Sequence, residues 1–160
     1  MYKIILTLIV TLFLTSNTYA AGSSSSSSSS SNYDKAVKLI KSAKKYEQKD
    51  KADKAKKLYS QAFKKFEKAY SKDKKNPDIL NYLGFTSRKS GNFTEAEDYY
   101  LKGLSINPKH NGINEYLGEL YVQTNRIDKA NERLEVLKTC NCKEYQELEL
   151  IIKTRGTKIY

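Results

Sequence analysis

A repeat with a period of 34 residues constrains the fold of this chain more than any other feature. Tyr82-Leu83-Gly84 recurs as Tyr116-Leu117-Gly118. At the same offset, small and bulky residues recur in pairs: Ala96 and Ala130, Tyr100 and Leu134, Phe93 and Ile127. Periods of about 20 to 50 residues indicate repeat architectures, in which each supersecondary unit stacks on its neighbours. Scarce glycine and proline, 7 and 2 residues, disfavour a turn-rich all-β fold. The period therefore predicts a stack of helical units.

The residues within one period follow a recognisable order. The unit that begins near residue 77 contains, in sequence, Leu80-x-x-Leu83-Gly84, Gly91, Ala96-x-x-x-Tyr100 and Pro108. This order resembles the tetratricopeptide repeat family, whose unit runs large-x-x-Leu-Gly-x-x-Tyr, Ala-x-x-x-Phe, Pro. Ser87 and Asn114 depart from it, because the family prefers tyrosine and a large residue there. The resemblance implies an all-α fold, a right-handed solenoid of helical hairpins.

Residues typical of helix ends agree with these boundaries. Asn76-Pro77 places a capping side chain before a proline at the first helical position. Gly91 can adopt the left-handed conformation that ends a helix. Asn92-x-x-Glu95 resembles a capping box, with asparagine in place of serine or threonine. We therefore expect one helix to end near residue 90 and the next to begin near residue 93.

A divergent repeat is expected upstream of residue 77. Offsets of 41 and of 34 both align it with the next unit, because segment 52–72 repeats its own pattern every seven residues. The repeating residues are Ala55, Tyr59, Ala62, Phe66 and Ala69. We expect its two helices near 33–49 and 52–73.

A capping helix is expected after the last repeat. Tyr145, Leu148, Ile151 and Ile152 fall on one face of a helix, and the last unit of a solenoid needs a cap over its apolar face. The predicted folded domain, 33–160, has repeats at about 36–76, 77–110 and 111–142 and a capping helix at about 143–153.

Residues 1–20 carry the parts of a secretory signal peptide. Lys3 supplies the positive start, Ile4 to Leu14 is an apolar run broken by two threonines, and Ala20 ends the expected cleavage site. The run is shorter than the roughly 20 apolar residues that span a bilayer, so cleavage is favoured over an uncleaved anchor. Residues 21–32, with nine consecutive serines, are expected to form a flexible linker. We therefore expect an exported protein, periplasmic or secreted.

The positive charge is concentrated in one part of the chain. Of the formal net charge of +11, residues 33–75 contribute +10, from 16 lysines and 6 acidic residues, while residues 76–160 are balanced. Solvated helix faces explain many lysines, since lysine is a good helix former. The alternative is attraction to an anionic partner, such as an acidic protein or a membrane surface. Nucleic acid is a poor candidate if the protein is exported.

Cys140 and Cys142 are separated by one residue and are the only cysteines. An exported protein with two cysteines favours their oxidation. The pair and the following Glu144-Tyr145-Gln146-Glu147-Leu148 resemble small exported bacterial proteins of the tetratricopeptide type. Three interpretations stay open: a local disulfide that holds the capping helix, free or intermolecular thiols, and a thiol redox site.

No motif for catalysis, a cofactor or a metal stands out. His110 is the single histidine and falls in the expected loop after Pro108. The sequence has no glycine-rich phosphate loop, nucleophile elbow or histidine-based metal motif. We expect a protein that is not an enzyme and needs no cofactor.

The resemblance also implies a ligand groove, lined by the first helix of each hairpin. Carrying the groove-facing positions over gives Lys44 in the first repeat, Asp78, Asn81, Phe85, Arg88 and Lys89 in the second, and Glu115, Glu119, Val122 and Gln123 in the third. Phe85 is the sharpest candidate, either as an exposed aromatic anchor or as a packing residue between helices.

Three functional hypotheses follow from these patterns. The leading one is an exported scaffold or adaptor that binds a protein or peptide segment in its groove. The second is association of the basic first hairpin with the cell envelope or another anionic surface. The third is thiol redox activity at Cys140 and Cys142.

Overall fold

The computed structural model describes residues 25–156, and within this range helices joined by short turns are the only regular secondary structure. The seven helices are α1 Ser25–Glu47, α2 Ala52–Tyr70, α3 Pro77–Lys89, α4 Phe93–Ile106, α5 Asn111–Gln123, α6 Ile127–Leu137 and α7 Lys143–Lys153. The predicted all-α class is confirmed. The expected signal peptide, 1–20, lies outside the described residues.

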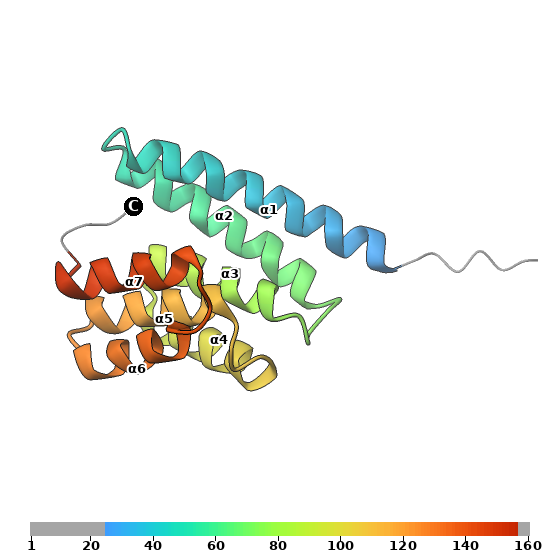
Figure 1. Ribbon diagram of the computed structural model, residues 1–160. Helices are drawn as coiled ribbons and strands as arrows, with labels where there is room; N and C mark the ends of the chain where they lie inside the picture. Colours follow the sequence, from blue (N-terminus) through green and yellow to red (C-terminus); the bar gives the residue numbers. More distant parts are fainter. Residues whose placement is uncertain (1–24, 157–160) are drawn as a thin grey trace, which may run out of the picture.

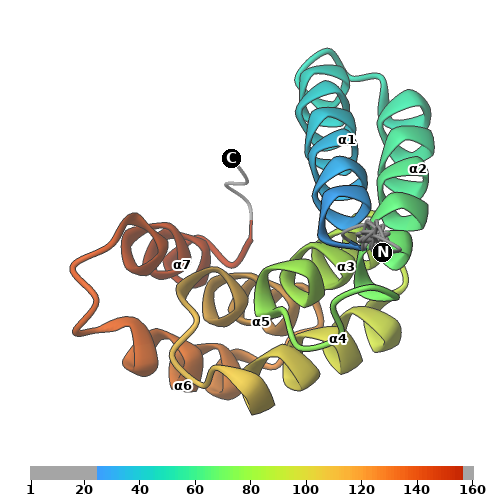
Figure 2. The same ribbon diagram turned by 90° about the vertical axis from the view of Figure 1, so that its right-hand side faces the viewer.

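Consecutive helices pair as hairpins, α1 with α2, α3 with α4 and α5 with α6, and α7 follows as a single helix (Figure 1). Viewed from the side in Figure 2, α1, α3, α5 and α7 form the inner layer, and α2, α4 and α6 form the outer layer. The helices α1 and α7 stand on opposite sides of a concave face, with α3 and α5 between them. The arrangement is a short helical solenoid with a distinct inner surface.

Alternating small and aromatic residues hold the first hairpin together. The buried face of α2 consists of Ala55, Tyr59, Ala62, Phe66 and Ala69. Alanines allow the helix backbones to approach, and the aromatic rings fill the space between them. The predicted seven-residue pattern thus corresponds to the face of α2 that is buried in the core.

Two glycines allow close approach between helices. A Cβ atom at Gly84 would collide with the ring of Tyr100 on α4. A Cβ atom at Gly118 would lie 2.5 Å and 2.6 Å from the two terminal methyl groups of Leu148 on α7. Gly84 therefore permits packing within its own hairpin, and Gly118 permits α7 to dock on α5.

The helix ends agree with the sequence in part. The Asn76 side chain accepts hydrogen bonds from the backbone N–H groups of Asp78 and Ile79, at 3.0 and 3.3 Å, as expected of a cap. Gly91 has a φ of +90°, the expected left-handed conformation. The expected capping box is wrong, because the Asn92 side chain makes no cap. The carboxylate of Glu95 instead accepts from the Ser87 hydroxyl at 2.8 Å, so it is directed back to α3.

The first helix is longer than expected. It begins at Ser25, inside the serine tract of 21–32 that was expected to be a flexible linker. Once a helix has formed, each further residue adds a backbone hydrogen bond without a new nucleation cost, and serine is only a moderately poor helix former. None of the described helices is long and apolar enough to span a bilayer.

Candidate functional site

Two hollows lie along the inner layer of helices. The larger, of about 550 Å³, is lined by residues of α1, α3, α5 and α7 and of the loop before α5, including Tyr33, Asp78, Asn81, Tyr82, His110 and Glu144. The smaller, of about 80 Å³, is lined by Lys44, Phe85, Arg88, Lys89, Glu119 and Glu147 among others. Glu115, Tyr116 and Lys143 line both hollows, which are therefore adjacent. We call the two together the concave groove.

The structure brings most of the predicted groove residues together. Asp78 and Asn81 line the larger hollow, and Glu115 lines both. The smaller hollow adds Lys44, Phe85, Arg88, Lys89 and Glu119. Val122 and Gln123 line neither hollow: Val122 is buried near Gly156, and Gln123 is exposed at the end of α5.

Arg88 is a buried ion-pair partner rather than a free ligand-binding group. Its side chain pairs with Glu119, and the two residues are 5% and 6% exposed. The guanidinium carbon lies 5.7 Å from the ring centroids of both Phe85 and Tyr116. Burial disfavours the charged form of Arg88, but Glu119, Tyr100 and Tyr116 together outweigh it and raise the pKa of the guanidinium. The pair joins α3 to α5 in the floor of the groove.

Phe85 is a packing residue, so its interpretation as an exposed anchor is corrected. It is 4% exposed. Its ring packs edge-on against Tyr59, with the ring centroids 5.7 Å apart, and its centroid lies 5.0 Å from that of the Tyr116 ring. Burial on three sides by α2, α5 and its own helix leaves little of the ring for a ligand. The packing alternative is the one that the geometry supports.

A hydrogen-bonded network joins the first hairpin to α3. The Lys89 ammonium lies 2.7 Å from the carboxylate of Glu47, which also accepts a hydrogen bond from the Tyr59 hydroxyl at 2.8 Å. Lys44 lies 5.4 Å from the centroid of the Phe85 ring. Lys44 and Lys89 therefore line one end of the groove with their ammonium groups already in contact with the protein.

Four glutamates gather where α5 meets α7: Glu115 and Glu119 on α5, and Glu144 and Glu147 on α7. Glu115 is 4% exposed. Burial raises the pKa of Glu115, and its hydrogen bond to Glu147 and the negative charges of Glu119, Glu147 and Glu144 raise it further. The raised pKa favours a neutral Glu115 carboxyl, which hydrogen-bonds to Glu147 across the α5–α7 contact. Lys143, 3.6 Å from Glu147, supplies a compensating charge.

Asn81 provides an unpaired acceptor on the wall of the larger hollow. Its side chain is 7% exposed, and among the described residues its Oδ1 atom has no hydrogen-bond partner. A buried acceptor without a partner costs free energy comparable to a lost hydrogen bond. The atom is itself covered, so a ligand N–H group in the hollow reaches it only when a neighbouring side chain moves aside.

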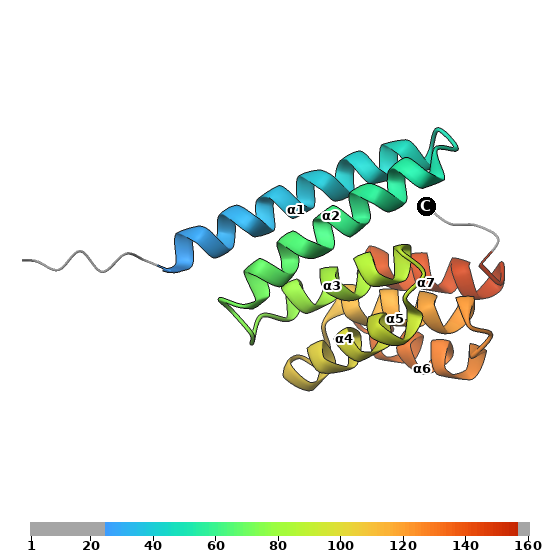
Figure 3. The ribbon, with the colours of Figure 1, turned by 180° about the vertical axis from the view of Figure 1, so that it is seen from behind.

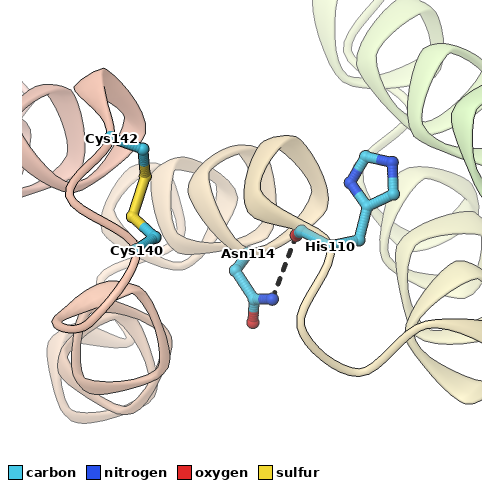
Figure 4. Close-up of a disulfide and its surroundings, with 4 residues drawn as sticks. All are labelled: His110, Asn114, Cys140 and Cys142. Atoms are coloured by element: carbon cyan, nitrogen blue, oxygen red, sulfur yellow. Dashed lines mark hydrogen bonds between the residues drawn. A yellow bond between two sulfur atoms is a disulfide. The ribbon is translucent and has the colours of Figure 1, made fainter.

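Cys140 and Cys142 are joined by a disulfide in the turn between α6 and α7 (Figure 4). Their Cα atoms are 5.2 Å apart, which lies in the usual range for a disulfide. Cys142 directly precedes Lys143, the first residue of α7. The bond closes the turn that connects α6 to α7, the helix that forms one wall of the groove. The described residues contain no cluster of histidine, cysteine and acidic side chains that could hold a metal ion.

Comparison with known proteins agrees with this geometry. A sequence model described as tetratricopeptide repeat matches residues 77–110, which is the α3–α4 hairpin. The second hairpin therefore resembles a tetratricopeptide repeat. No curated protein matches the chain significantly.

Solved structures with the tetratricopeptide fold extend the likeness beyond this hairpin. The Yersinia enterocolitica type III secretion chaperone SycD, in complex with a peptide of the translocator YopD, superposes with a TM-score of 0.52 at 20% identity. That match covers 77% of this chain and 90% of the other. The same chaperone in an alternative dimer gives a TM-score of 0.53 at 20% identity, covering 77% and 89% of the two chains. These likenesses show the fold.

One groove residue that tetratricopeptide patterning did not predict is His110. Its Nδ1 accepts the backbone N–H of Ile113 at 3.1 Å, capping α5, and its Nε2 donates to Asp78 at 3.0 Å. His110 thus lies in the loop after Pro108, as expected, and also serves as the cap of α5. A signal was available, because His110 lies 34 residues after Asn76, the cap of α3.

Proposed function

We propose that this protein is an exported, non-catalytic scaffold that binds an extended segment of a protein partner in the concave groove. The observation that carries the proposal is the buried, unpaired Oδ1 of Asn81 on the wall of a 550 Å³ hollow. An extended peptide presents main-chain N–H groups at regular intervals, and such a donor satisfies this acceptor.

The larger hollow has the mixed chemistry that suits a peptide. Tyr33, Tyr82 and Tyr116 offer aromatic faces for apolar side chains, while Lys143 and Glu144 offer charges of both signs at the α7 wall. Arg88 and Glu119 are engaged with each other in the smaller hollow. We therefore place the main ligand contacts in the larger hollow, nearer the N-terminal ends of α3, α5 and α7.

Two further lines of support come from the fold and from the N-terminal sequence. The SycD structure that shares this fold holds a peptide of YopD, which is a precedent for a peptide ligand. The positive start, apolar run and small residue within 1–20 support export.

The binding proposal is tested with a displayed library of random dodecapeptides. Peptides enriched on the wild-type protein are synthesised, and their affinity is measured by fluorescence anisotropy for wild type, Asn81→Ala and Asn131→Ala. Asn131 is exposed on α6, outside the groove, so it is the matched control. We expect weaker binding to Asn81→Ala alone, by roughly 5-fold to 100-fold for a lost buried hydrogen bond. Failure to enrich any peptide, or equal binding to both variants, would refute the proposal.

The export proposal is tested separately. The protein is expressed with a C-terminal tag, cells are fractionated, and the N-terminus of the exported form is sequenced. We expect cleavage after Ala20 and retention of the full-length chain inside the cell for Ile9→Arg, which interrupts the apolar run. An uncleaved chain in the cytoplasmic fraction would contradict export without affecting the groove.

A further inference from the structure

Sixteen lysines between residues 33 and 75 form a basic surface that, apart from Lys44, lies outside the concave groove. Fifteen of them are exposed, and the remaining one, Lys65, is half-buried. Most lie on α1 and α2, the long hairpin that runs along one side of the stack in Figures 1 and 3. We call these lysines together the lysine hairpin surface.

The charge of this surface is not neutralised within the described part of the molecule. None of its sixteen lysines forms an ion pair among the described residues. Between residues 76 and 156, by contrast, seven of the eleven lysines and arginines do so: Arg88, Lys89, Arg126, Arg133, Lys138, Lys143 and Lys153.

The acidic residues of the same segment are partly committed elsewhere. Glu47 is engaged by Lys89 of α3 and by the Tyr59 hydroxyl. Asp73 accepts hydrogen bonds from the Asn76 side chain and the Lys75 backbone. Two of the six carboxylates are therefore used in other contacts, and the segment keeps a surplus of +10 even when all six are counted.

The lysines are arranged in stripes along both helices. Lys35, Lys38, Lys41 and Lys45 follow one another at three- and four-residue intervals on α1, so they share a face over about 15 Å. Lys54, Lys57, Lys64 and Lys68 form a corresponding stripe over about 21 Å of α2. Like charges at these spacings repel one another, so a polyanionic partner relieves a repulsion already present in the free protein.

We propose that the lysine hairpin surface binds the anionic surface of a lipid bilayer. All sixteen basic residues of the segment are lysine and none is arginine, whereas residues 76–160 contain four arginines. Lysine is a compact, strongly hydrated charge, and it is attracted to a fluid anionic surface without having to lose its water or match a fixed geometry.

The composition of the surface argues against a protein as the partner. Protein interfaces are depleted in lysine and enriched in arginine and aromatic residues. The large hydrophobic residues that are exposed in the described part of the chain, Phe93, Leu101 and Ile106, all lie on α4 rather than on the hairpin. The surface therefore lacks the apolar anchors of a protein interface and attracts through charge alone.

The test uses the mature chain in flotation assays with phosphatidylcholine vesicles, with and without about one third phosphatidylglycerol. One variant combines Lys38→Gln, Lys41→Gln and Lys45→Gln. The matched control combines Lys109→Gln, Lys129→Gln and Lys138→Gln, which are exposed lysines outside the hairpin, so both variants lose the same net charge. Circular dichroism checks that each variant retains its helices.

We expect binding only to the anionic vesicles, falling as salt is added. Each lysine near such a surface contributes about fivefold, so the hairpin variant should lose about a hundredfold in partitioning and the control much less. Equal loss in both variants would mean that net charge alone decides, and would overturn the proposal. Absence of vesicle binding, or tighter binding to double-stranded DNA than to vesicles at the same salt, would also overturn it. The result does not depend on peptide binding in the groove.

Discussion

Asn81→Leu separates a binding role for this residue from a structural one. Leucine keeps the branched shape of asparagine but removes the unpaired Oδ1 from a side chain that is 7% exposed. Leaving a buried acceptor unsatisfied costs about 1–3 kcal/mol, part of which the variant recovers. We therefore expect the free energy of unfolding to rise by about 1 kcal/mol, which corresponds to roughly 3–6 °C in Tm for a domain of this size.

The same substitution should weaken peptide binding. The ligand N–H that pairs with Asn81 would enter the hollow without an acceptor, at a cost of about 1–3 kcal/mol, or roughly 5-fold to 150-fold in Kd. Thermal unfolding followed by circular dichroism and anisotropy titration of a library-selected peptide measure the two effects. Asn131→Leu, on the exposed face of α6, should leave both unchanged. Lower stability together with unchanged affinity would show that Asn81 supports the fold and would refute our reasoning.

Other predictions concern the polar contacts that shape the groove. Glu119→Gln should lower the free energy of unfolding by about 3–5 kcal/mol, because it leaves Arg88 buried without its counter-ion. Urea titration should show that adding Arg88→Met restores most of this loss. His110→Ala should cost about 1 kcal/mol through the lost α5 cap, whereas His110→Asn, which imitates Asn76, should cost less in the same titration. Burial raises the pKa of Glu115 in the folded protein. Its contribution to the free energy of unfolding is therefore fully present below a pH of about 4.3, the ordinary pKa of glutamate, and is lost as the pH rises through the higher folded-state pKa. The stability of wild type relative to Glu115→Gln should therefore fall with rising pH in thermal unfolding curves. A parallel course for the two proteins would contradict the raised pKa of Glu115.

The pattern of small and large residues predicted the packing because it reports contacts between adjacent helices. Gly84 and Tyr100 are only 16 residues apart, and their contact follows from pairing one helix with the next. The same is true of the alanines of α2. Such contacts repeat with the period, so aligning the units was sufficient to find them.

Polar contacts were harder to predict because they depend on where each side chain points. The carboxylate of Glu95 binds Ser87 rather than the helix end that a capping box requires. Asn114, a departure from the repeat pattern, is buried and donates to the carbonyl oxygens of Pro108 and His110, so it secures the turn before α5 (Figure 4). Neither partner could be found from periodicity, which describes apolar positions only.

The sequence predicted where the groove residues lie better than it predicted what their side chains do. The repeat pattern indicated which face of each first helix turns inward, and eight of the ten residues line the two hollows. It could not show that Phe85 and Arg88 are covered, because that depends on Tyr59 from α2 and on Glu119 and Tyr116 from α5. Exposure in a groove is decided by the side chains of neighbouring units, which the pattern of a single unit does not describe.

The last helix links the stability of the stack to its ligand site. Leu148 of α7 covers Gly118 and closes the apolar end of the solenoid, while Lys143 and Glu144 of the same helix line the larger hollow. A peptide that contacts this wall binds only when α7 is docked, so binding must stabilise the docked state by mass action. The hydrogen bond between Glu115 of α5 and Glu147 of α7 favours the same docked state. Groove occupancy and capping of the core are therefore thermodynamically coupled, and a change that loosens α7 should weaken peptide binding even where no groove residue is altered.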